Sequence, residues 1–127
     1  MARVLALSGD LLFGSRVQGA LAAAGHDVQL VGDEPRLLQA LEGSGDPVGG
    51  GVDVLIVDLT DSALEGASIV ESLRAGGQLG AARTLGFYSH VEIATRERAE
   101  AAGFDLVVPR SRMAREGAEL IDGLLRG

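Results

Sequence analysis

Acidic, hydroxyl and basic side chains recur in this sequence directly after short apolar runs. They are Ser8 and Asp10 after the first run, Asp58 and Asp61 after the third, Tyr88, Ser89 and His90 after the fourth, and Arg110 after the fifth. If the runs are parallel strands, these side chains meet at the carboxyl edge of one sheet, where ligands bind in open α/β folds. We expect a pocket there that combines acid, hydroxyl and cation.

The stretch "LALSGDLLFGSRVQGAL", residues 5–21, is compatible with a phosphate cradle or with a carboxylate pocket. Gly9, Gly14 and Ser15 suggest the cradle. However, a Walker A loop needs a lysine and then a hydroxyl after its second glycine, and Ser15 and Arg16 occupy those positions. The dinucleotide fingerprint G-x-G-x-x-G is also missing from this turn. We therefore interpret Gly14 as a close-packing or helix-start residue.

Asp58 ends the most uniformly apolar run, "DVLIVDL". A carboxylate in that position carries a desolvation penalty unless water, a hydrogen bond or a cation offsets it. Two interpretations stay open on position alone. Asp58 is either a working carboxylate or a helix N-cap, although Asp61 and Ser62 offer competing caps in the same turn.

Five apolar runs alternate with helical patterns along the chain. The runs cover residues 3–8, 27–31, 53–59, 83–89 and 104–109, and the helical patterns cover residues 13–24, 34–41, 62–74, 92–102 and 115–125. Strands that alternate with helices predict a parallel sheet with helices on its faces. Residues 43–51 read as a glycine-rich surface loop, and the 127 residues suit a single domain, 1–127.

Composition excludes several classes of function. The net charge is -7 and lysine is absent, so no nucleic-acid-binding surface is expected. Cysteine is absent and the only histidines are His26 and His90, so no histidine-based metal site is expected. No apolar run has the length of a membrane span and no signal-peptide pattern precedes the first strand, so we expect a cytoplasmic protein.

The segment "DVLIVDLTDSALEGASIVESLRAGG" resembles the response-regulator receiver domains of the CheY-like type. Asp58, the pair Glu65-Gly66, Ile69 and the pair Leu73-Arg74 keep that family's order and spacing. The resemblance implies a (βα)5 flavodoxin/CheY-like fold, a doubly wound parallel five-stranded sheet of order 2-1-3-4-5. It also implies that Asp58 is the phospho-acceptor, that Asp10, Ser89 and Arg110 surround the phosphoryl group, and that Asp10 and Asp58 hold Mg²⁺.

Departures from the family pattern fall on these same positions. Ser8 and Gly9 occupy the two places where receivers carry the acidic pair for magnesium, and Asp10 comes one residue later. Arg110 stands for the receiver lysine, with Pro-Arg in place of Lys-Pro. The fifth strand, Leu106 to Val108, also lacks the aromatic switch residue of the family. This pattern indicates a pseudo-receiver.

The leading prediction is a stand-alone receiver-like signalling module that acts by protein-protein contact, with phosphorylation of Asp58 weak or absent. One alternative is a working phospho-acceptor that a histidine kinase modifies on Asp58. A second is a small-molecule or nucleotide sensor on the same fold. No nucleophile-base pair suggests an enzyme. The alanine-rich fourth helix, with Arg96 and Arg98, is the expected moving part, and a homodimer through the fourth helix, fifth strand and fifth helix is a further prediction.

Overall fold

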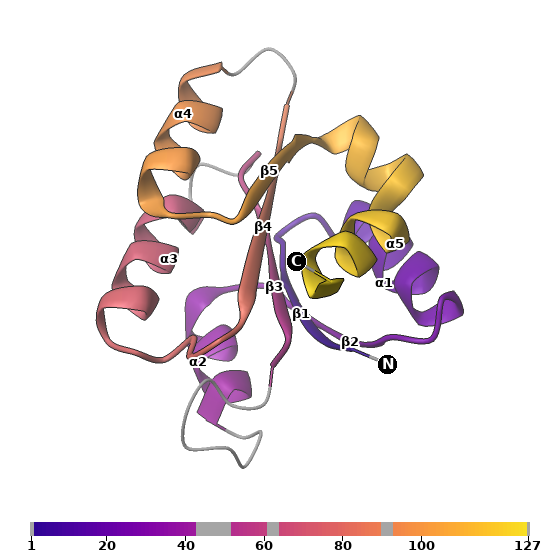
Figure 1. Cartoon of the computed structure of the whole chain (residues 1–127), viewed down its shortest axis with the longest axis horizontal. Coiled ribbons are helices and arrows are strands. Elements are labelled where there is room, and N and C mark those ends of the chain that lie inside the picture. Colours follow the sequence, from indigo (N-terminus) through magenta and orange to yellow (C-terminus); the bar gives the residue numbers. More distant parts are fainter. Residues whose placement is uncertain (1, 43–51, 61–63, 90–92, 127) are drawn as a thin grey trace.

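The computed structural model describes residues 2–42, 52–60, 64–89 and 93–126, in which five parallel strands alternate with five helices (Figure 1). The predicted loop 43–51, Asp61, Ser62, His90 and Glu92 lie outside the described residues. The strands and helices in chain order are β1 Arg3–Leu7, α1 Leu11–Ala23, β2 Asp27–Val31, α2 Glu34–Glu42, β3 Val54–Asp58, α3 Gly66–Ala75, β4 Arg83–Tyr88, α4 Ile93–Ala102, β5 Leu106–Pro109 and α5 Arg110–Arg126.

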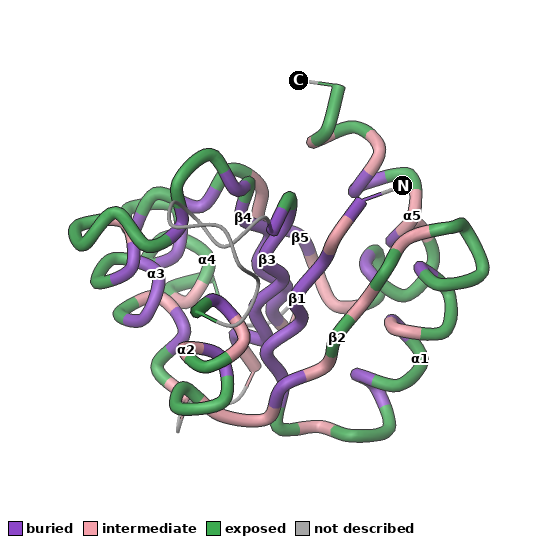
Figure 2. Tube along the Cα trace, turned by 90° about the horizontal axis from the view of Figure 1, so that it is seen from below, coloured by how far each residue is buried: buried purple, intermediate pink, exposed green. Residues whose placement is uncertain are grey.

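The strand order is β2-β1-β3-β4-β5, which confirms the predicted doubly wound sheet. Helices α1 and α5 cover one face, and α2, α3 and α4 cover the other (Figures 1 and 2). Every residue of β3 is buried, as expected for a central strand with helices on both sides. This topology places the carboxyl ends of β1, β3, β4 and β5 at one edge.

Each face of the sheet has its own hydrophobic core, because successive side chains of a strand point to opposite faces. Leu55 and Val57 of β3 belong to the core under α2, α3 and α4. Val54 and Ile56 of the same strand belong to the core under α1 and α5. Both helical layers therefore pack on the same sheet. The loops at the edges of the sheet are positioned by this packed core.

Helix α5 begins earlier than the sequence predicts. The expected start was near residue 115, but the helix starts at Arg110, directly after Pro109. Glu116 has non-helical dihedral angles (φ -125°, ψ 19°), so α5 consists of two helical segments joined at a kink. The first segment buries only Met113, which is too little apolar pattern to reveal a helix in the sequence.

Helix α3 begins later than predicted, at Gly66 rather than near residue 62. Glu65 adopts a left-handed conformation with φ 50°, which a helix cannot contain. A Cβ on Gly66 would lie 2.5 Å from Cγ1 of Val57, so the start of α3 packs directly against β3. The Glu65-Gly66 pair thus fixes where α3 leaves the turn that follows Asp58.

Helix α4 buries little side-chain surface. Its buried residues are Ala99 and Ala102. Arg98 on α4 donates two hydrogen bonds to Glu71 on α3, at 3.0 and 2.6 Å, but both side chains are about half exposed. Exposed ion pairs of this kind contribute little to stability.

Across the described residues, no helix combines the length and apolar character of a membrane span.

Candidate functional site

Asp58 is buried at the end of β3 and is 1% exposed. Its Oδ2 accepts a hydrogen bond from the Ser8 hydroxyl at 2.7 Å. Its Oδ1 accepts from the backbone N–H of Thr60 at 2.8 Å and from the Thr60 hydroxyl. Such a bond from a residue two positions later is typical of an Asx turn. Asp58 is therefore not the N-cap of α3, a position that Glu65 holds without a side-chain hydrogen bond.

The sequence places Ser8 among the side chains at the strand ends but does not predict its contact with Asp58. Ser8 is 2% exposed, and its Oγ both donates to Asp58 and accepts from the backbone N–H of Asp10 at 3.1 Å. The sequence carried a signal for it, because Ser8 occupies the first of the two positions where receivers have acids. A serine there meets the Asp58 carboxylate with a hydroxyl donor instead of a second negative charge.

Asp10 lies at the N-terminus of α1, where Oδ1 accepts a hydrogen bond from the Phe13 N–H at 3.0 Å. Its Oδ2 accepts from the Arg110 guanidinium at 2.9 Å. The Phe13 hydrogen bond and then the Arg110 charge lower the pKa of Asp10. Arg110 also lies over the Phe13 ring, 4.3 Å from its centroid, which is a cation-π contact. Asp10 and Arg110 thus form an ion pair in which each charge balances the other.

The structure brings together part of the predicted set. Asp10 contacts Arg110, and Ser8 links Asp10 to Asp58, but no described ion pair joins Arg110 to Asp58. Ser89 is half-buried and lines a pocket of about 460 Å³ with five other residues. The pocket is lined by Phe13, Arg16, Thr60, Ser89, Arg110 and Ser111. Asp58 does not line it, whereas Thr60, which donates to Asp58, does.

The described side chains do not fit a magnesium ion held by Asp10 and Asp58. Magnesium requires near-octahedral oxygen coordination, to which proteins contribute one or two carboxylates and water supplies several ligands. Asp10 faces the positive charge of Arg110, which repels a cation, and Asp58 is 1% exposed with Ser8 on its Oδ2. Within residues 2–42, 52–60, 64–89 and 93–126, no group of three or more acidic or histidine side chains is arranged to hold a metal.

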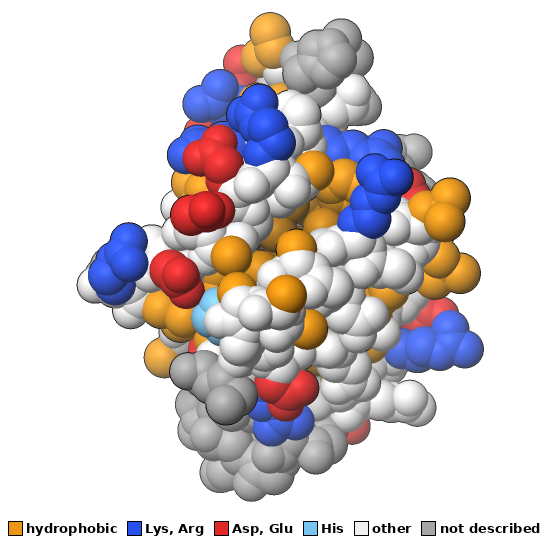
Figure 3. Space-filling view, turned by 90° about the vertical axis from the view of Figure 1, so that its right-hand side faces the viewer, with side chains coloured by type: hydrophobic (Ala, Val, Ile, Leu, Met, Phe, Trp, Pro, Cys, Tyr) orange, Lys and Arg blue, Asp and Glu red, His pale blue; other side chains and the backbone are white. Residues whose placement is uncertain are grey.

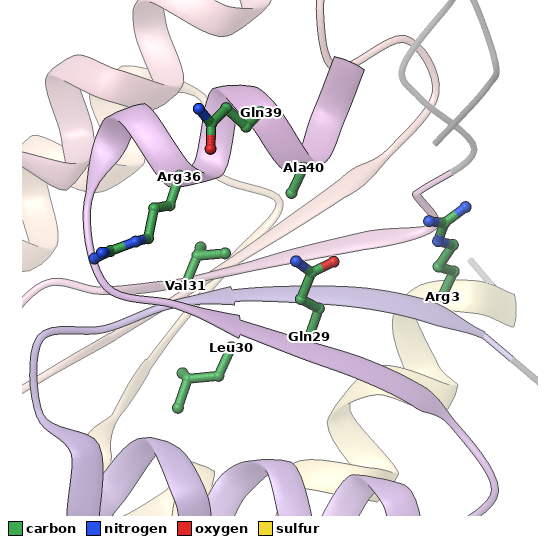
Figure 4. Close-up of a pocket in the computed structure, with 7 residues that line it drawn as sticks. All are labelled: Arg3, Gln29, Leu30, Val31, Arg36, Gln39 and Ala40. Atoms are coloured by element: carbon green, nitrogen blue, oxygen red, sulfur yellow. The ribbon is translucent and has the colours of Figure 1, made fainter. Parts of the chain in front are cut away.

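Another pocket, of about 410 Å³, lies between α2 and the edge strand β2 (Figure 4). Gln29 and Gln39 face it with amides, and Arg36 at its border is paired with Asp33 at 3.2 Å. None of the residues predicted from sequence lines this pocket. The candidate site therefore remains at the carboxyl edge of the sheet.

Asp10→Asn is expected to change how stability depends on pH. Asparagine caps helices about as well as aspartate, so the variant keeps the cap and loses the charge that faces Arg110. Because the folded-state pKa of Asp10 lies below the usual 3.8, its charge stabilises the fold above that pH, and the contribution disappears as pH falls through the folded pKa. Urea unfolding should show wild type more stable at neutral pH and the difference vanishing in strong acid. A difference that is constant with pH would contradict this assignment.

The comparisons with known proteins rest on structure alone. No protein-family model and no curated protein matches the sequence. A response regulator from Thermotoga maritima matches with a TM-score of 0.81 at 13% identity, covering 100% of this chain and 99% of that one. The receiver domain of Francisella response regulator 1452 matches with a TM-score of 0.81 at 15% identity, covering 99% and 98%.

The chemotaxis response regulator CheY4 of Vibrio cholerae matches with a TM-score of 0.80 at 19% identity, covering 98% of this chain and 99% of that one. These three proteins span the same length and the same sheet as the present chain. At such low identity they establish the architecture. The chemistry of the site must be inferred from the residues of this chain. The chain therefore has the CheY-like α/β fold of response regulator receiver domains.

Proposed function

We propose that this protein is a receiver-like signalling module that acts through protein-protein contact and that Asp58 is a structural residue, not a phospho-acceptor. The observation that carries the proposal is the environment of Asp58. It is 1% exposed and its two oxygens accept hydrogen bonds from Ser8 and Thr60. An aspartate nucleophile must instead be within reach of the phosphodonor, whereas Asp58 is buried and the Ser8 hydroxyl lies on its Oδ2.

The charges around the site support the same proposal. Transfer of a phosphoryl group concentrates negative charge, which a metal ion or a positioned cation must neutralise. Here the nearest predicted cation, Arg110, is paired with Asp10 at 2.9 Å and lies over the Phe13 ring. The position that would add a carboxylate for magnesium is Ser8, which binds Asp58 directly. Arg110 is thus paired with Asp10, and the described donors to Asp58 are uncharged.

A protein partner is the proposed output, and the face formed by α4, β5 and α5 is the proposed contact surface. Ile93 at the start of α4 is 66% exposed, and Arg96 is paired within α4, with Glu100. Because only alanines of α4 are buried, a partner can shift this helix at small cost in packing. A homodimer through the same face is part of this proposal. Light scattering over a wide concentration range that shows only monomer would reject the dimer.

Exposure to a phosphodonor tests the role of Asp58. The protein is incubated with acetyl phosphate and Mg²⁺, and intact mass is measured. We expect no added phosphoryl group, while a receiver domain with the acidic pair gains one under the same conditions. A phosphoryl adduct that is absent in Asp58→Asn would overturn the proposal in favour of a working receiver modified by a histidine kinase.

A further inference from the structure

Two adjoining hollows lie between α1 and the beginning of α5 and share Phe13 and Arg16. The outer one is the 460 Å³ pocket with Arg110, Thr60, Ser89 and Ser111. The inner one, of about 130 Å³, is lined mainly by apolar side chains of the two helices, among them Val17, Leu21 and Met113. Figure 3 looks onto the side of α1 and α5 and shows recessed hydrophobic surface bordered by basic side chains. Together the hollows form what we call the α1/α5 crevice.

The charge of the α1/α5 crevice is opposite to that of the whole protein. The chain carries a net charge of -7, yet among the described residues the ionisable side chains that line the two hollows are both arginines, Arg16 and Arg110, of which Arg110 is paired with Asp10. In the described part of the chain Arg16 makes no hydrogen bond or ion pair, and the first turn of α5 contains no acidic residue. Guanidinium groups bind carboxylates and phosphates through charge-assisted hydrogen bonds, so an anion fits here.

The inner hollow adds space for an apolar group. It is similar in size to an engineered apolar cavity of about 150 Å³ that binds benzene. Gly117 helps to keep it open, because a Cβ there would lie 3.4 Å from Cε of Met113. Ala20 and Ala114 complete the walls with small side chains. The hollow thus fits a short hydrocarbon chain or a small ring.

We propose that the α1/α5 crevice binds a small organic anion, with a carboxylate or phosphate head on Arg16 and Arg110 and a short apolar tail between α1 and α5. This ligand site goes beyond the proposed signalling function and does not depend on it. Because Arg110 also holds Asp10 at 2.9 Å, a bound head competes with Asp10 for the same guanidinium. Ligand binding is thereby connected to the network that continues through Ser8 to Asp58.

Amide NMR titration of the full chain tests the proposal with hexanoate as the probe. Acetate supplies the head without the tail, and hexanamide supplies the tail without the charge. We expect hexanoate to shift amides of residues 13–21 and 110–117, with an affinity at least about tenfold above that of either control. Acetate lacks the tail, in which each buried CH₂ contributes about 0.8 kcal/mol, and hexanamide lacks the charge that strengthens hydrogen bonds from arginine. Hexyl phosphate identifies the preferred head by its affinity relative to hexanoate.

Two variants locate the site. Arg16→Gln removes an exposed, unpartnered charge and is expected to weaken hexanoate binding about tenfold. Ala114→Leu fills the inner hollow and is expected to weaken hexanoate but not acetate. Arg115→Gln and Ala22→Leu change exposed residues of α5 and α1 outside both linings and should bind hexanoate as wild type does.

Three results would overturn the proposal: no hexanoate-dependent shifts, equal affinity for hexanoate and acetate, or equal loss of binding in Arg16→Gln and Arg115→Gln. The last two would show unspecific attraction of anions to arginine. None of these results bears on Asp58, whose role is tested separately by the phosphodonor, so either proposal can fail without the other.

Discussion

Replacing Phe87 by alanine is expected to lower the free energy of unfolding by about 3–5 kcal/mol, the range for truncation of a buried aromatic side chain. Phe87 is 2% exposed in β4 and belongs to the core under α1 and α5. Its ring lies 5.0 Å from the ring of Phe13, at an interplanar angle of 47°. Truncation therefore removes the packing of Phe87 itself and the support beneath Phe13. Urea unfolding at neutral pH measures the loss.

The same substitution should disturb the candidate site. Arg110 lies over the Phe13 ring while it holds Asp10, so a displaced Phe13 loosens both contacts. We expect the pKa of Asp10, followed by carbon NMR of its carboxyl group, to move back toward its usual value of 3.8.

Leu125→Ala is the control, because Leu125 is a large apolar residue that is 43% exposed, and surface changes of this kind stay within about 0.5 kcal/mol. A loss below about 1 kcal/mol in Phe87→Ala would contradict the assigned packing.

The fold was predictable because its signals are repeated along the chain. The apolar run that became β3 is buried throughout, and the alternation of strands and helices leaves few topologies for a parallel sheet. Helix ends were less predictable, because they depend on single residues. The left-handed Glu65 delays α3, and the kink at Glu116 separates the predicted part of α5 from its first segment.

The site was predictable in its position but not in its contacts. The carboxyl ends of parallel strands share an edge, which sufficed to group Asp10, Ser89 and Arg110. Which groups pair depends on distances of a few tenths of an ångström that no spacing encodes. In the structure Arg110 donates to Asp10, and Ser8 and Thr60 donate to the Asp58 carboxylate. Ser8 was expected at this edge, but nothing about a serine at a strand end predicts its hydrogen bond to Asp58.

Asp58→Ala is expected to lower the free energy of unfolding by roughly 1–3 kcal/mol, the cost of leaving buried donors without an acceptor. The Thr60 N–H and the Ser8 hydroxyl both donate to Asp58 and would lose that acceptor. Ser8→Ala should also destabilise, since Oδ2 of Asp58 would remain buried without its donor. Because the two residues contact each other, the double variant should lose less than the sum of the single losses.

Asp53→Ala provides the matched control. Asp53 also accepts a hydrogen bond from a backbone N–H, that of Arg3 at 2.8 Å, but Asp53 is exposed, so water can replace its carboxylate as the acceptor.

The sign of the Asp58 effect on stability separates the two roles of this residue. A carboxylate that lies among other carboxylates raises the energy of the folded state by mutual repulsion, so its removal stabilises the protein. Asp58 instead meets hydroxyl and N–H donors, and its removal should destabilise. A gain in stability in Asp58→Ala, with no coupling to Ser8, would contradict the structural role of Asp58.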